Sequence, residues 1–491
     1  MINNNNGNPR AILQRIARKA MLDRGFLTDF PPNAIAALNG MLESALKIAD
    51  PVKDLRDLSW CSIDNDDSED LDQLSVAVGM PSGDVKILVA IADVDAMVSQ
   101  QSAFEDHANH NTTSVYTSAL IFPMLPEKLS TDLTSLKFDA DRLSVVVEFV
   151  VGDDGSVKSS DIYQAAVNNK AKLAYNSLGA WLESGNALPR GVGAVRGLDE
   201  NIRLQETVAK GLKTLRYKNG ALYLETIETR PVFKGDEVSD LQEEKPNTAK
   251  DIIQEFMISA NTVTARFLSS KGLPSLRRIV RVPKRWDRIV ALASDQKFRL
   301  PAQPDSKALD QFLLSAKSKD PDGFADLSLC VIKLLGRGEY MVELPGDDSA
   351  GHFGLAVKDY THSTAPNRRY PDLITQRMLK AALSGKQAPY TGDQLAAIAT
   401  HCTTMEDGAK KVERQVEKST AALLLKSKTG AQFDSIVTGA SEKGTWVRIF
   451  HPPVEGKLVS GFEGLDVGQK VRVQLVHTDV ERGFIDFKKV K

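Results

Sequence analysis

The sequence predicts a multidomain α+β protein, in which a mixed α/β central domain lies between a small N-terminal helical module and a C-terminal five-stranded barrel of the OB type. Three observations support this prediction. The chain has 491 residues, which is enough for about two to four domains. Its central part combines short apolar strands with amphipathic helices. Its last segment contains five short β-segments separated by Gly- and Asp-containing turns. We therefore divide the chain into residues 1–50, 51–428 and 429–491.

The composition excludes several classes of protein. Hydrophobic residues make up 42% and charged residues 26% of the chain, and the net charge is −2, so any affinity for nucleic acid must come from local patches. We find no apolar run long enough to span a membrane and no signal-peptide pattern. The cysteines (Cys61, Cys330 and Cys402) are far apart and odd in number, which indicates neither a disulfide framework nor a zinc cluster. We expect a cytoplasmic monomer.

The N-terminal module is expected to be helical. Apolar residues recur at helical spacing over residues 11–27, and Pro31 and Pro32 end that pattern. Asn33 is a candidate cap for a second helix that extends to about residue 48.

An acidic stretch at residues 62–74 (SIDNDDSEDLDQL) dominates the central domain. Its six carboxylates fall between two apolar segments: Asp64, Asp66, Asp67, Glu69, Asp70 and Asp72. Carboxylates at this density repel one another unless cations neutralise them, and oxygen ligands suit Mg²⁺ or Mn²⁺. A solvated acidic loop is the alternative, but the flanking apolar segments hold this loop in place, so we favour metal binding. An EF-hand starting at Asp64 is excluded, because its sixth and twelfth positions hold Glu69 and Ser75.

The remainder of the central domain is expected to alternate between strands and helices. Asp93 lies at the end of a buried strand. Strands are expected over residues 74–78, 85–94, 142–151, 157–167 and 221–233, and helices over residues 170–183, 201–215, 251–269 and 405–425.

Two basic segments suit a phosphate-bearing ligand. Residues 266–288 carry eight basic side chains against Asp287 alone. Charge leaves open whether they form a solvated face or a channel that follows phosphates. Arg368 and Arg369 precede a helix that opens at Tyr370, and both guanidinium groups and helix N-termini favour phosphate. In the C-terminal barrel, Trp446 is either a core residue or a surface on which bases stack.

Several blocks of the sequence, in order and at family spacing, resemble the ribonuclease II / ribonuclease R family of exoribonucleases, whose catalytic domain is called RNB. They cover about residues 54–425, and the barrel resembles an S1-type RNA-binding domain. The acidic stretch resembles the family's metal-binding signature DxxxxxDxDD at Asp64, Asp70 and Asp72. The last Asp of that signature is Gln73 here, which removes one negative charge.

The resemblance also implies roles for residues outside the acidic stretch. Asp72 is the residue whose loss is expected to stop catalysis, and Arg368 is expected to stabilise charge on the scissile phosphate. Tyr223 and Phe233 are candidates for a base-stacking position in the middle of the domain. The residues expected to contact RNA, each from its own block, are Tyr116 (SVYTSALIFPMLPEKLSTDLTSL), Tyr175 (AKLAY), Glu255 (IIQEFMISAN), Arg278 (LRRIVRVP), Arg368 (TAPNRRYPDLI), Glu413 (KKVERQV) and Trp446 in the barrel.

The resemblance implies a hydrolytic 3′→5′ exoribonuclease that degrades single-stranded RNA processively to nucleoside 5′-monophosphates. The catalytic residues would be Asp64, Asp70, Asp72 and Arg368, and the three aspartates would hold Mg²⁺, with Mn²⁺ as a substitute. An RNA-binding regulator with an RNB fold, in which Gln73 has weakened catalysis, is the main alternative. A metal-dependent phosphoesterase acting on small molecules is a further one, against which the RNA-binding barrel argues.

Overall fold

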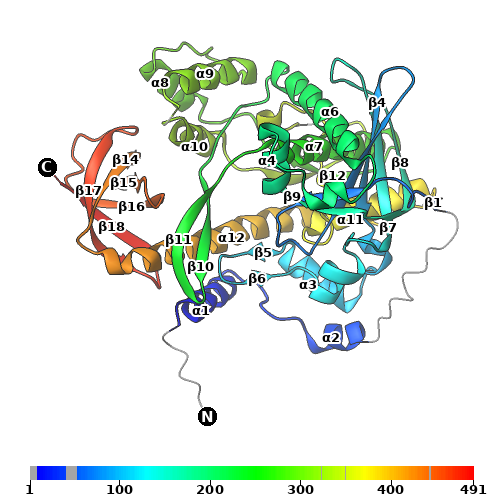
Figure 1. Cartoon of the computed structure of the whole chain (residues 1–491), viewed down its shortest axis with the longest axis horizontal. Coiled ribbons are helices and arrows are strands. Elements are labelled where there is room, and N and C mark those ends of the chain that lie inside the picture. The colour runs from blue at the N-terminus through cyan, green and yellow to red at the C-terminus, as the bar shows by residue number, and fades with distance from the viewer. Residues whose placement is uncertain (1–7, 40–51, 322, 349, 442–443, 491) are drawn as a thin grey trace.

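The structure is a computed structural model and describes residues 8–39, 52–321, 323–348, 350–441 and 444–490 (Figure 1). Most of its helices lie in the central domain. The α-helices are α1 (Pro9–Leu22), α2 (Pro32–Asn39), α3 (Ala103–Asn111), α4 (Tyr175–Ser184), α5 (Arg190–Gly193), α6 (Leu198–Lys218), α7 (Thr248–Ser270), α8 (Trp286–Asp295), α9 (Ser306–Lys319), α10 (Phe324–Leu335), α11 (Tyr370–Leu383) and α12 (Gly392–Leu425). Short helical turns are η2 (Val94–Ala96), η3 (Lys128–Leu133), η4 (Phe353–Leu355) and η5 (Lys426–Lys428).

A seven-stranded mixed sheet forms the core of the central domain. Its strand order is β1-β8-β7-β4-β3-β2-β9, with β1 and β9 parallel to their neighbours at the two edges. The strands predicted over residues 74–78, 85–94, 142–151 and 157–167 are confirmed as β3, β4, β7 and β8. The bounds are β1 (Lys53–Asp54), β2 (Cys61–Asp64), β3 (Gln73–Gly79), β4 (Val85–Ala92), β7 (Asp141–Val151), β8 (Val157–Asn168) and β9 (Ala171–Ala174).

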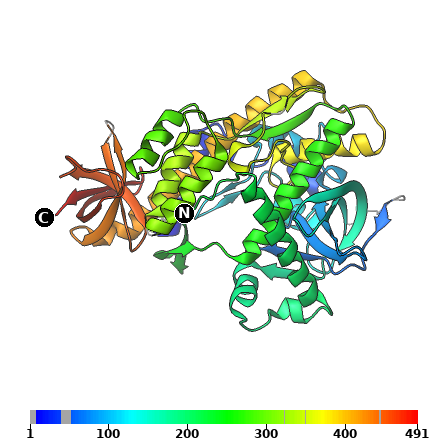
Figure 2. The same cartoon turned by 90° about the horizontal axis from the view of Figure 1, so that it is seen from above.

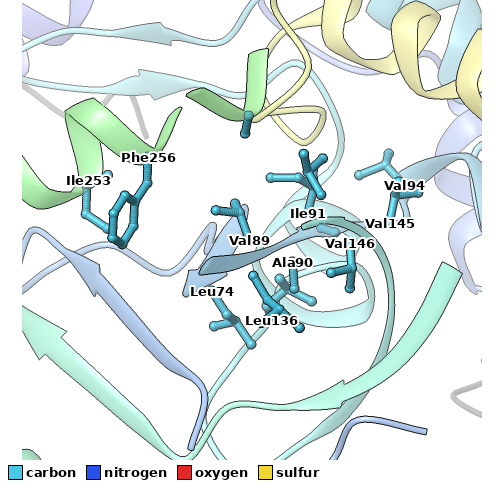
Figure 3. Packing of buried hydrophobic residues seen from close by; sticks show 14 of the residues in the cluster. Leu74, Val89, Ala90, Ile91, Val94, Leu136, Val145, Val146, Ile253 and Phe256 are labelled. Carbon is cyan, nitrogen blue, oxygen red and sulfur yellow. The ribbon is translucent and has the colours of Figure 1, made fainter. Parts of the chain in front are cut away.

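The hydrophobic core lies on both faces of this sheet. Helices α6 and α7 pack against one face, since they contact β3 and β7. Figure 3 shows Phe256 and Ile253 of α7 at the edge of the same buried cluster as Val89 on β4. Leu136, from the loop after η3, belongs to the same buried cluster. Successive apolar side chains of β4 point to opposite faces of the sheet and so contribute to the core on both faces. This close-packed sheet holds the ends of the loop between β2 and β3 in place.

Two predictions of secondary structure were wrong in part. The helix expected over residues 170–183 begins only at Tyr175, because the preceding residues form the edge strand β9 beside β2. The strand expected over residues 221–233 is confined to β10 (Glu228–Lys234), which pairs with β11 (Glu237–Glu244) in a hairpin outside the main sheet.

The first helix, α1, packs along the long helix α12 (Figure 1). It ends at Leu22 instead of residue 27. Its apolar side joins a buried cluster with Met405, Val412 and Val416 of α12. The second predicted helix is present as α2, but it begins at Pro32, so Asn33 lies within its first turn and is not its cap. Its expected extension to residue 48 lies outside the described residues.

The five-stranded C-terminal barrel is confirmed and closes in the order β14-β15-β16-β18-β17. It lies at one end of the molecule (Figure 2). Arg448 on β15 forms an ion pair with Asp326 on α10, which joins the barrel to the central domain. The barrel strands are β14 (Gln432–Ser441), β15 (Gly444–Ile449), β16 (Val454–Ser460), β17 (Lys470–Asp479) and β18 (Phe484–Lys489), and the remaining two-stranded pairs are β5 (Val115–Tyr116) with β6 (Ile121–Phe122) and β12 (Ser275–Ile279) with β13 (Glu339–Glu343). Within the described chain, every helix is too short or too polar to cross a bilayer.

Candidate active site

The acidic stretch forms the loop between β2 and β3, and backbone hydrogen bonds hold its second half in place. The Leu71 amide donates to Ser135 Oγ (3.1 Å), and the Leu136 amide donates to the Leu71 carbonyl (2.9 Å). The Ala92 amide, at the end of β4, donates to the Asp72 carbonyl (2.9 Å). The backbone around Asp72 is therefore anchored to the sheet, whereas the loop before it reaches toward solvent.

Asp72 is the most buried carboxylate of the loop, with 2% of its surface exposed. Its Oδ1 accepts a hydrogen bond from the Asn367 amide (3.0 Å), and its Oδ2 accepts one from Arg368 Nε (3.0 Å). Burial raises the pKa of Asp72 to about 7, against the lowering effect of the Arg368 charge, and the neighbouring Asp70 raises it further. The pair therefore joins a carboxyl group that titrates near neutral pH to a permanently charged guanidinium.

Backbone hydrogen bonds with residues 112–114 position Arg368 just before the start of α11. The Ser114 amide donates to the Arg368 carbonyl (2.9 Å), and the Tyr370 amide donates to the Thr112 carbonyl (2.8 Å). Asp372, in the first turn of α11, accepts from the Ala365 amide (2.9 Å) and from Arg369 (2.6 Å). These bonds fix the turn before the helix, so that the Arg368 side chain, 42% exposed, points along the surface beside Asp72.

Asp70, Tyr116 and Glu413 form a second connected group beside this pair. Tyr116 Oη donates to Asp70 Oδ2 (2.6 Å), and the Tyr116 amide donates to Glu413 Oε1 (3.1 Å). Burial raises the pKa of Glu413 above its ordinary value. The structure thus brings residues predicted from three distant sequence blocks into contact.

Asp64 and Tyr175 complete the cluster from the other side. Asp64 ends β2 and accepts hydrogen bonds from Ser68 Oγ (3.0 Å) and the Asn65 amide (2.7 Å). Burial raises the pKa of Asp64, with a smaller lowering effect from Arg368. Tyr175 begins α4, and burial followed by the charge of Asp64 raises the pKa of its phenol.

The predicted metal ligands fit a divalent ion by their chemistry, since carboxylate oxygens are the ligands that Mg²⁺ and Mn²⁺ prefer. In the part of the chain that the structure describes, however, no three His, Cys, Asp or Glu side chains lie close enough together to hold a metal ion. Both carboxylate oxygens of Asp72 already accept hydrogen bonds. The assignment of metal to Asp64, Asp70 and Asp72 stays a prediction.

Two cations outside the predicted set also pair with the acidic loop. Arg230 on β10 forms ion pairs with Asp66 (3.5 Å) and Asp67, and Lys172 on β9 lies 3.3 Å from Glu69. Sequence reasoning missed both residues, because they belong to strands more than a hundred positions away along the chain and no local pattern marks them.

Three of the predicted RNA-contacting residues lie outside this cluster. Glu255 is 2% exposed and accepts two hydrogen bonds from Arg216 across α6 and α7. Arg278 on β12 is buried, with Glu406 on α12 as its ion-pair partner at 2.7 Å. Trp446 is half-buried on β15. In this structure the charges of Glu255 and Arg278 are therefore engaged within the protein.

Several arginines of the basic segment at residues 266–288 are also paired with acidic side chains within the protein. Arg277 is 1% exposed and paired with Glu343 (2.6 Å). Arg266 pairs with Asp359 (3.1 Å). Much of the positive charge in this segment is thus neutralised by acidic partners, which the local sequence did not reveal.

The two candidates for base stacking lie in different parts of the structure. Tyr223 stacks against Phe324 with 5.9 Å between ring centroids, whereas Phe233 lies on the β10–β11 hairpin.

A cleft of about 760 Å³ opens beside the cluster, between the acidic loop, the β10–β11 hairpin and α12. Asp70, Tyr116, Arg230 and Glu413 lie in its wall. The site therefore combines a cleft, a buried carboxyl group paired with a partly exposed guanidinium, and flanking tyrosines.

The RNB domain family matches residues 52–385, and the RNase II-type exonuclease C-terminal S1 domain matches residues 431–490. The first match covers well over half of the chain. The chain belongs to the RNB domain family. Its RNB domain contains all four predicted catalytic residues, and its C-terminal barrel is an S1 domain.

Several proteins that the chain is similar to are ribonucleases R. The chain is 27% identical to ribonuclease R 1 of Lactococcus lactis over 467 residues, which cover 89% of this chain and 56% of that protein. The chain spans about half to two thirds of the length of the curated relatives it matches. Ribonuclease R of Mycoplasma genitalium, solved with ribose-methylated single-stranded RNA, matches with a TM-score of 0.88 and 22% identity, over 99% of this chain and 79% of that one. Yeast Ssd1, solved as a pseudonuclease, matches with a TM-score of 0.69 and 15% identity, over 95% of this chain and 57% of that one. At these identities both solved structures support the fold alone.

Proposed function

We propose that this chain is a hydrolytic 3′→5′ exoribonuclease that degrades single-stranded RNA to nucleoside 5′-monophosphates. The observation that carries the proposal is the pair formed by the buried Asp72 and the partly exposed Arg368, beside which Asp70 and Tyr116 line the cleft. The curated relatives are ribonucleases R, and one solved neighbour holds single-stranded RNA. Because those proteins are longer, the activity is proposed for this chain on the strength of its own site.

Arg368 is suited to stabilise the charge that develops on the phosphate during hydrolysis. Its Nε is fixed by Asp72 Oδ2, while the side chain is still 42% exposed. A guanidinium held in this way presents its remaining N–H groups without having to reorganise, which is the most effective form of electrostatic catalysis. The anchoring of residues 365–372 at the start of α11 keeps this geometry.

Asp72 is suited to hold the metal ion beside the scissile phosphate. In the metal-free protein, burial raises the pKa of its carboxyl group to about 7, and binding of a divalent cation would favour the ionised form. RNB-family nucleases generally depend on divalent metal ions. When bound, such an ion supplies an activated water and neutralises charge on the phosphate. We assign the ion to Asp64, Asp70 and Asp72, with Mg²⁺ as the physiological ion and Mn²⁺ as a substitute.

The two tyrosines would position the last nucleotides. Tyr116, 38% exposed, lies in the wall of the cleft with its hydroxyl on Asp70. Tyr175 lies beside Asp64 at the start of α4. Stacking on aromatic rings is tolerant of sequence, as expected of an enzyme that degrades any single strand. Processive degradation by a cytoplasmic monomer, with the S1 domain and Trp446 holding the strand, completes the proposal.

An RNA-binding regulator without catalysis is the second candidate. It is favoured by Gln73, which replaces the last Asp of the metal-binding signature, and by the yeast pseudonuclease Ssd1, which has a similar fold. The two candidates differ only in whether bound RNA is cleaved.

The test is digestion of a 5′-labelled single-stranded RNA with Mg²⁺ by the wild type, Asp72→Asn and Asp67→Asn. Asp67 is an exposed carboxylate of the same loop, so its variant is the matched control. We expect a descending ladder with the wild type and Asp67→Asn, and none with Asp72→Asn or with a chelator. RNA that the wild type binds in a gel shift but leaves intact would refute the nuclease and favour the regulator.

A further inference from the structure

The helix α12 presents opposite charge on two of its faces. Glu413 and Glu417 are turned toward the cleft of the candidate active site. Lys411, Arg414 and Lys418, spaced three and four positions apart, form a stripe along another face. This basic stripe faces α1 and the turn between β17 and β18 of the S1 barrel. No step of the proposed reaction uses it.

A groove of about 570 Å³ runs between α1, the stripe on α12 and the barrel turn. Six basic and two acidic side chains line it, so that its net charge is +4, whereas the whole chain carries −2. The basic residues are Lys19, Arg24, Lys411, Arg414, Lys418 and Arg482, and the acidic residues are Asp23 and Glu481.

The positive charge of this groove is largely available to a ligand. Arg24 donates only to neutral acceptors, the Ala20 carbonyl (2.9 Å) and Gln415 Oε1 (2.8 Å). Glu481 is held by the guanidinium of Arg15. Among the described residues, no acidic side chain forms an ion pair with Lys19 or Lys411. This contrasts with residues 266–288, where several arginines are neutralised by acidic partners.

The walls of the groove are held in place by contacts among α1, α12 and the turn between β17 and β18. The Arg15–Glu481 pair ties α1 to the barrel turn. Gly483, at φ +67°, lies so close to α12 that an added Cβ would come within 2.8 Å of Lys418 Cβ. At the groove's edge, the Phe484 ring is 53% exposed and offers an aromatic face.

We propose that this groove binds the phosphate backbone of single-stranded RNA at a place separate from the cleavage site. Arg482 is paired with Asp479 at 3.9 Å, but Lys19, Arg24 and Lys411 have no ion-pair partner among the described residues. Basic side chains of this kind along a concave surface follow phosphates, and an exposed aromatic ring adds base stacking. An acidic protein would satisfy the charge but would make no use of the ring as a stacking surface for bases. The choice of RNA as the polyanion rests on the proposed function. The site also gives α1 a role, since this helix supplies Lys19 and Arg24 to the groove.

The test is the salt dependence of RNA binding by fluorescence anisotropy, with a labelled single strand of about 20 nucleotides and a chelator present so that no RNA is cleaved. The variant is Lys19→Gln/Lys411→Gln. Both lysines are exposed, which leaves the packing of Lys418 on the barrel turn intact. The control is Lys319→Gln/Lys386→Gln, which changes the net charge equally at exposed lysines outside the groove.

If each groove lysine contacts one phosphate, the slope of log K against log salt falls in magnitude by about 1.4 in the groove variant. We expect weaker binding in that variant and wild-type binding in the control. Equal slopes and affinities in the wild type and both variants would overturn the groove while leaving the nuclease proposal intact. Failure of the wild type to bind RNA at all would overturn both proposals.

Discussion

In the metal-free protein, replacing Asp72 with Asn should change how the free energy of unfolding depends on pH. Burial raises the pKa of this carboxyl group from 3.8 to about 7 in the folded state. The folded protein therefore binds the proton more tightly than the unfolded chain. As the pH rises from about 4 to about 7, ionisation removes stability from the folded state, and above pH 7 the loss is complete. A difference of about three pKa units corresponds to about 4 kcal/mol, of which about 3 kcal/mol falls between pH 4.5 and 8.

Urea unfolding of the wild type and Asp72→Asn, in chelator and over this pH range, measures the effect. Groups common to both proteins cancel in the difference between their free energies of unfolding. We expect this difference, variant minus wild type, to rise by about 3 kcal/mol from pH 4.5 to 8. For Asp67→Asn, which removes an exposed carboxylate, the difference should stay nearly constant. A difference that is equally constant for Asp72→Asn would refute the account of a carboxyl group held at a raised pKa by burial.

Three further predictions concern the metal, the core and the barrel. Gln73→Asp restores the last carboxylate of the metal-binding signature, so we expect half-maximal RNA cleavage at a lower Mg²⁺ concentration than in the wild type; an unchanged Mg²⁺ dependence would exclude a role for this position in metal binding. Phe256→Ala removes a fully buried ring that packs edge-on against Phe149, so the free energy of unfolding measured in urea should fall by about 3–5 kcal/mol, and a loss below about 1 kcal/mol would contradict the packing. Arg448→Ala leaves the carboxylate of Asp326, itself 2% exposed, without its ion-pair partner, and hydrogen exchange should become faster in α10 and β15; unchanged protection there would contradict the described link between barrel and central domain.

The features that could be predicted from the sequence are those determined by the pattern of residues within a short segment of the chain. The short apolar runs of β3 and β4 and the five C-terminal strands follow directly from local patterning. The acidic stretch could be singled out because it lies between apolar segments, and Asp72 within it because it matches the most sensitive Asp of the RNB family. The helix α12 was predicted only from residue 405 onward, and its first 13 residues were missed although Leu395, Ala399 and Cys402 lie at helical spacing on its buried face.

The features that could not be predicted depend on pairs of residues far apart in the chain. Glu255 and Arg216 lie on neighbouring helices and neutralise each other, which a polar residue in an amphipathic helix does not reveal. Arg278 lies in a basic run, yet its partner Glu406 is more than a hundred positions away. Strand β9 was hidden because its four residues continue into α4 without a helix-breaking residue between them.

The central claim is that Asp72 and Arg368 form a working hydrolytic site that releases nucleotides from the 3′ end. The most direct measurement follows one single-stranded RNA labelled at its 3′ end and, in a parallel reaction, at its 5′ end, with Mg²⁺ and the wild-type protein. The account predicts that the 3′ label is released at once as a nucleoside 5′-monophosphate, while the 5′ label passes through a descending ladder. Release of the 5′ label first, internal fragments, or RNA that is bound and left intact would contradict it.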